Sequence, residues 1–152
     1  FTFLSYQKDL RIHYLIWITI MSCFLLYKIY KLIKKITYIT FHNQVMICFS
    51  FLSMLIGSYL PYDPNHENII SILHIILSSL GALSLLIIIQ ILINRIILVD
   101  LIFYKKMTMI YRSLILMLGM FIIMFGSINS IVELFFTFTV LISLNEIEKY
   151  FK

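Results

Sequence analysis

One histidine within the most apolar part of the chain is the first residue that could carry chemistry. His74 lies inside residues 68–94, a stretch without Asp, Glu, Lys or Arg. An ionisable group in such a segment indicates a functional role, as a proton relay, a haem ligand or a contact to a lipid headgroup. The alternative is a neutral histidine that is hydrogen-bonded to a nearby backbone carbonyl or serine. Both interpretations stay open at this point.

Two further polar residues interrupt apolar segments. Glu133 is the one acidic residue that follows the uncharged run 113–132 within an apolar context, and Gln90 lies near the end of the segment that contains His74. A carboxylate buried in hydrocarbon is costly, which would make Glu133 functional. Close to the membrane interface it would instead stay hydrated. We therefore treat His74, Glu133 and Gln90 as the polar candidates within the membrane.

Motifs of the common catalytic and metal sites are missing from the sequence. It contains no P-loop, no GxSxG, no HExxH and no EF-hand loop. Cys23 and Cys48 both fall in apolar stretches, without CxxC or a zinc-type spacing. Asp63, His66 and Glu67 form a polar loop that could bind a cation weakly or could simply be solvated. We expect no catalytic residue, no metal and no cofactor.

Composition places the chain in a membrane. Hydrophobic residues make up 62% of the sequence and charged residues only 12%, which is far from the balance of a soluble domain. The net charge of +5 comes from basic residues at the ends of apolar runs rather than along one polar face, so nucleic acid is excluded as a partner and membrane lipid is favoured. A single alanine (Ala82) amid Ile, Leu, Phe, Tyr and Lys indicates an AT-rich genome, and hence a bacterial or organelle membrane.

The pattern of uncharged runs predicts an all-α integral membrane helical bundle of about five transmembrane helices, in a single domain. The expected spans are residues 12–33, 45–60, 69–93, 107–125 and 128–145. One helix over 107–145 would be roughly 58 Å long, about twice the hydrocarbon thickness. It must therefore break, and Gly126–Ser130 is the expected hairpin. The chain begins without Met, so residues upstream of it are expected to be missing.

Small residues and lysines suggest how these helices pack and where lipid binds. Small residues recur on the faces of the second and third spans, where they let helices approach closely. The expected packing positions are Ser53, Gly57, Ser78, Gly81, Ala82 and Gly119. The densest basic cluster suits anionic lipid and consists of Lys28, Lys31, Lys34 and Lys35. By the positive-inside rule, the basic connections 28–35 and 95–112 lie on the cytoplasmic side and the acidic loop 61–68 lies opposite.

The segment 55–90 resembles the DRAM/FRAG-type membrane proteins. The resemblance rests on GSYLPY, a short polar loop and LHIILSSLGALSLLIIIQ, with matching positions at Gly57, Tyr59, His74, Gly81, Ala82 and Gln90. It implies a six-helix bundle whose first helix precedes this sequence. It also implies a non-enzymatic protein connected with membrane trafficking, autophagy or the handling of lipid anchors.

Two hypotheses for function follow. The first is a non-catalytic polytopic membrane protein that packs against a larger membrane assembly or recognises lipid. The alternative is an accessory subunit of a respiratory or transport complex that uses His74 or Glu133 for protons or a cofactor.

Overall fold

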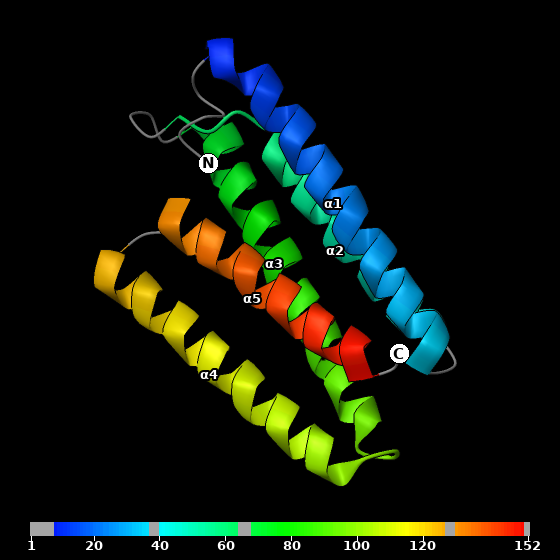
Figure 1. The fold of residues 1–152 in the computed structure, drawn as a ribbon. Helices are drawn as coiled ribbons and strands as arrows, with labels where there is room; N and C mark the ends of the chain where they lie inside the picture. The colour runs from blue at the N-terminus through cyan, green and yellow to red at the C-terminus, as the bar shows by residue number, and fades with distance from the viewer. Residues whose placement is uncertain (1–7, 37–39, 64–67, 127–129, 151–152) are drawn as a thin grey trace. The chain divides into compact units, whose positions relative to one another are not determined.

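The computed structural model describes residues 8–36, 40–63, 68–126 and 130–150. These residues form helices and connecting turns, with no strand among them, which confirms the expected all-α membrane bundle of about five helices (Figure 1). The helices are α1 (Lys8–Ile36), α2 (Phe41–Tyr59), α3 (Ile69–Ile96), α4 (Leu101–Phe125) and α5 (Ser130–Tyr150).

Four of the five helices are long and apolar enough to cross a membrane, judged over the described residues. They are α2, α3 and α4 over their whole lengths and α1 over Arg11–Lys35. The fifth helix, α5, is not among the four, and its 21 residues include Glu133, Glu146, Glu148 and Lys149. The chain is thus a membrane-associated protein, and the crossing expected over residues 128–145 stays a prediction.

The start of α4 differs from the expected span. The helix begins at Leu101 rather than near residue 107, because the side chain of Asp100 accepts a hydrogen bond from the Phe103 amide at 2.9 Å and caps the first turn. The basic residues expected in a connection are therefore helical. The end of α4 agrees with the expected break, since Gly126 has a φ of 64°, a left-handed conformation that favours glycine. Residues 127–129 of the expected hairpin lie outside the described residues.

The chain divides into two compact units, which we describe separately. The first unit comprises residues 1–27 and 40–88, and the second comprises residues 28–39 and 89–152. The helix α2 belongs to the first unit, and α4 and α5 belong to the second. The helices α1 and α3 each contribute their N-terminal part to the first unit and their C-terminal part to the second.

Buried side chains differ in kind between the units. In the first unit many are small or polar: Ser22, Ser50, Ser53, Ser58, Ser71 and His74. In the second unit the side chains with almost no exposure are mainly aliphatic: Ile29, Leu32, Ile89, Ile93, Ile96, Met107, Val140, Leu144 and Ile147. In a membrane, burial of large apolar side chains gains little over contact with lipid, so helices associate through close contacts and hydrogen bonds. The small and polar side chains buried in the first unit suit such contacts.

In the second unit α4 and α5 lie side by side and run in opposite directions (Figure 1). Aromatic contacts lie at both ends of the pair. Phe121 meets Phe135 edge to face, with ring centroids 4.9 Å apart, and Phe103 stacks on Tyr150 at 4.0 Å. These contacts fix the register of the two helices.

Candidate functional site

His74 holds the chain segment that follows α2. Its Nδ1 lies 3.0 Å from the carbonyl oxygen of Leu60, its ring lies 5.4 Å from that of Tyr62, and the side chain is buried. Because a carbonyl oxygen can only accept, Nδ1 carries the proton of this bond. The contact corresponds to the structural interpretation of His74, a histidine bonded to a backbone carbonyl.

Ser71, one turn before His74, makes a second contact of the same kind. Its hydroxyl oxygen accepts a hydrogen bond from the Asp63 amide at 3.1 Å. The amide of Ser71 donates to the Asn68 side chain at 2.7 Å, which caps the start of α3. The side chains of His74 and Ser71 therefore hold residues 60–63 against the first turns of α3 through hydrogen bonds. Both side chains are buried, and buried polar groups need such partners.

Small residues bring α2 and α3 into close contact. The Ser50 hydroxyl donates to the carbonyl oxygen of Gly81 at 2.8 Å. A Cβ atom on Gly81 would lie 2.8 Å from the Met54 amide nitrogen, and one on Gly57 would lie 2.8 Å from that of Ser78. Neither neighbour is a flexible side-chain end, so only glycine fits at these two crossings. Among the other expected packing positions, Ser53 is buried and Ala82 is half-buried.

Three expected site residues are not drawn into these contacts. Gly119 has no atom of another segment within 4 Å of where its Cβ would stand, among the described residues, so it does not mark a close helix contact there. Gln90 donates to Asn94 of its own helix at 2.7 Å. Glu133 is half-buried in the first turn of α5, where the positive end of the helix dipole favours a carboxylate.

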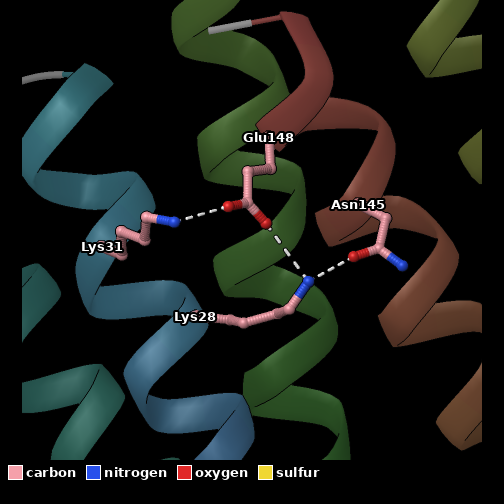
Figure 2. Close-up of polar contacts among 4 residues, drawn as sticks. All are labelled: Lys28, Lys31, Asn145 and Glu148. Carbon is pink, nitrogen blue, oxygen red and sulfur yellow. Dashed lines mark hydrogen bonds and ion pairs between the residues drawn. The ribbon is translucent and has the colours of Figure 1, made fainter. Parts of the chain in front are cut away.

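An ionic cluster joins α1 to α5 in the second unit (Figure 2). The Lys31 ammonium lies 2.8 Å from one oxygen of Glu148, and the Lys28 ammonium lies 3.2 Å from the other. Lys28 also donates to the side-chain oxygen of Asn145. Hydrogen bonds from Lys31 and then Lys28 lower the pKa of Glu148 from 4.5 to about 2. Two of the four lysines expected to contact anionic lipid therefore share one carboxylate within the chain, which offsets only one of their two charges.

The remaining two lysines of that cluster are Lys34 and Lys35. The Lys34 ammonium sits 4.6 Å from the centroid of the Tyr30 ring, a cation–π contact, and both Lys34 and Lys35 are exposed in the last turn of α1. The contact of Glu148 was not expected from the sequence, although a signal exists. Lys28 and Lys31 are three residues apart on one helix, and Asn145 and Glu148 are three apart on another, so two matching polar faces oppose each other.

Asp100 connects the start of α4 to the end of α5. One carboxylate oxygen caps Phe103, and the other accepts a hydrogen bond from the Tyr150 hydroxyl at 3.1 Å. The hydrogen bond from the Phe103 amide is the main reason that the pKa of Asp100 is lowered. Together with the stacking of Tyr150 on Phe103, this interaction brings the C-terminal end of α5 to the first turn of α4.

A groove of about 410 Å³ runs along α4, and we call it the α4 groove. It is lined by Tyr104, Lys105, Thr108, Met109, Arg112, Ser113 and Leu116. The hydroxyl of Thr108 is buried and has no hydrogen-bond partner in the part of the chain that the structure describes. Lys105 and Arg112 are exposed, and neither forms an ion pair with a described carboxylate. The α4 groove thus combines two unneutralised cations with an unused hydroxyl.

The remaining chemistry-bearing residues do not form a metal centre within the described ranges. No group of three His, Cys, Asp or Glu side chains there could hold a metal ion, and Cys23 and Cys48 are exposed free thiols. No family model, curated protein or solved structure matches the chain.

Proposed function

We propose that this chain is a non-catalytic integral membrane protein that recognises anionic phospholipid. The observation that carries the proposal is the separation of charge between the two units. The second unit contains ten Lys and Arg residues against four Asp and Glu, a net charge of +6, whereas the first contains two against three, a net charge of −1. All of the chain's excess positive charge therefore belongs to one unit.

The contacts within the second unit gather that charge at one end, which we call the basic end (residues 28–36, 95–112 and 145–150). Lys28 and Lys31 meet α5 at Glu148, and Tyr150 meets Asp100 at the start of α4. Basic residues that flank apolar helices attract the anionic leaflet, at about 1 kcal/mol for each cation near the surface. The positive-inside rule then favours a cytoplasmic position for the basic end.

The polar residues in the apolar segments support a non-catalytic role. His74 and Ser71 hold the segment after α2 through backbone groups, and Gln90 bonds to its own helix. The first unit therefore uses its polar side chains to position backbone. We keep the association with a larger membrane assembly and the resemblance to DRAM/FRAG-type proteins as predictions.

Purification in a mild detergent followed by lipid titration tests the proposal. We expect phosphatidylglycerol to raise the melting temperature of the protein and phosphatidylcholine, with the same acyl chains, to leave it nearly unchanged. Lipids that co-purify should also be enriched in anionic headgroups relative to the source membrane. Equal stabilisation by both lipids would contradict anionic recognition. Proteins identified in the same preparation test the association with a larger assembly.

A further inference from the structure

We propose that the α4 groove binds the phosphate group of one anionic phospholipid, with Lys105 and Arg112 as its cationic ligands. This inference rests on the proposed function and assigns it to one site. It also moves the expected lipid contact away from Lys28 and Lys31, which the structure pairs with Glu148.

The two cations are placed to act together. Lys105 and Arg112 are seven residues apart, so they lie on the same face of α4, two turns from each other. Thr108 lies between them on that face and lines the same groove. A guanidinium group offers paired donors for phosphate oxygens, and an ammonium group adds a compact charge. Neither cation has a carboxylate partner among the described residues.

The depth of Arg112 in α4 supplies a second reason for a bound anion. Residues 113–125 of α4 follow Arg112 before Gly126 ends the helix. They span roughly 20 Å, which is less than the hydrocarbon thickness of about 30 Å. With Gly126 at one boundary, the Cα of Arg112 therefore lies roughly 10 Å inside the other. An arginine at that depth extends to the interface and requires an anion or water there, and a lipid phosphate meets both needs.

Thr108 is the independent indication of a ligand. A threonine in a helix ordinarily donates to the carbonyl three or four residues earlier, but its hydroxyl here is buried without a partner among the described residues. Because a buried unpaired hydroxyl is costly, an acceptor at the groove would recover that loss through a change of one side-chain torsion. Ser113 and Tyr104 add two further hydroxyl groups to the lining.

The edge of the α4 groove favours a lipid over free phosphate. Met109 and Leu116 line it and remain 66% and 69% exposed. They lie seven residues apart, on the same stripe of the helix as the two cations. Apolar side chains beside a phosphate site provide a surface for an acyl chain, which inorganic phosphate cannot use.

The main test compares two double variants of the full chain in detergent. Lys105→Gln with Arg112→Gln removes the groove cations, and Lys34→Gln with Lys149→Gln removes the same charge elsewhere at the basic end. Binding of single phosphatidylglycerol molecules is followed by native mass spectrometry. We expect the groove variant to bind about 25-fold more weakly, about fivefold for each cation, and the control to change less than about twofold. Equal losses in the two variants would overturn the assignment.

A single substitution tests the role of the Thr108 hydroxyl separately from that of the two cations. Thr108→Val keeps the shape of the side chain and removes its hydroxyl. If the hydroxyl binds phosphate, affinity for phosphatidylglycerol falls by about tenfold or more, as expected for a lost hydrogen bond to a charged group. If Thr108 serves packing alone, the variant gains thermal stability and binds the lipid as well as wild type, which would remove Thr108 from the site.

Two further measurements complete the test. One distinguishes a lipid phosphate from free phosphate, and the other distinguishes a failure of the groove assignment from a failure of the proposed function. Inorganic phosphate at millimolar concentration should not displace phosphatidylglycerol, and displacement at that concentration would overturn the lipid as the ligand. A wild-type protein without preference for phosphatidylglycerol over phosphatidylcholine contradicts the proposed function itself. A wild-type preference that survives in the groove variant contradicts only the α4 groove.

Discussion

The two units of this chain differ in the share of polar side chains that they bury, which is larger in the first. The first unit has serine, glycine and histidine at its helix contacts, and these bond to backbone, as at Ser50 with Gly81 and His74 with Leu60. The second unit buries aliphatic side chains and carries ion pairs and unneutralised cations at its basic end. Side chains that already bond to backbone have little polar capacity left for a ligand, whereas exposed cations without a carboxylate partner can bind an anion. On this comparison rests our proposal of a positioning role for the first unit and of lipid recognition for the second.

Substitution of Gly81 should produce the largest loss of stability. It tests the close helix contact that we describe in the first unit. Gly81→Ala places a methyl group against the Met54 and Ser50 backbone, at 2.8 and 2.9 Å, so we expect a loss of about 1–3 kcal/mol in stability. The matched control is Gly119→Ala, which meets no atom of another segment within 4 Å among the described residues and gains helix propensity. Thermal unfolding in detergent measures both. Equal losses would mean that the contact of α2 with α3 is not specifically close.

Substitution of His74 should produce the second-largest loss of stability. His74→Leu removes the donor to the Leu60 carbonyl and leaves that oxygen unpaired, at a cost of about 1–2 kcal/mol. Glu133→Gln should cost less, because the amide keeps the shape of the side chain and loses only the favourable interaction with the helix dipole, about 0.3–1 kcal/mol. Yield and melting temperature of the two variants, measured side by side, decide the order. A larger loss for Glu133→Gln would place a functional polar group in the second unit's helix α5.

The ionic cluster of the second unit should contribute a smaller effect. Glu148→Gln leaves Lys28 and Lys31 without their carboxylate, which we expect to cost about 1 kcal/mol. Glu146→Gln is the control, because Glu146 pairs with Lys149 of its own helix, where such pairs contribute about 0.3–0.5 kcal/mol. Chemical or thermal denaturation of both variants gives the difference. An identical cost would show that the contact between α1 and α5 adds nothing beyond a local pair.

The helices could be predicted from sequence because their signal is local. Uncharged runs bounded by basic residues predict apolar helices wherever hydrocarbon must be crossed. The start of α4 was missed because Lys105 and Lys106 suggested a polar connection, whereas both are good helix formers and Asp100 caps the helix ahead of them. A basic residue in a membrane protein marks depth and does not by itself end a helix.

The site could be predicted only where small residues repeat on one face. Ser71, His74, Ser78 and Gly81 share a face by spacing alone, and the structure places contacts at each of them. A single glycine such as Gly119 has no such companions, so its environment could not be predicted from periodicity. The pairing of Glu148 with Lys28 joins residues 120 positions apart, so the sequence shows two polar faces with matching spacing but not that these faces meet.

Acid tests the Glu148 cluster separately from every other carboxyl group. In the folded protein the pKa of Glu148 is about 2, against an ordinary 4.5, since Lys31 and Lys28 donate hydrogen bonds to the ionised form. A lowered pKa stabilises the fold fully above pH 4.5, and this contribution is lost as the pH falls from 4.5 towards 2. The melting temperature of wild type should therefore fall more steeply than that of Glu148→Gln across this window, and the two curves should run parallel from pH 5 to 8. Asp100 and Glu146 also have lowered pKa values, but they are present in both proteins, so their effects cancel in the difference. Parallel curves below pH 4.5 as well would mean that the lysines do not hold Glu148 ionised, and that the second unit's cations are available to lipid at α1 as well as at the α4 groove.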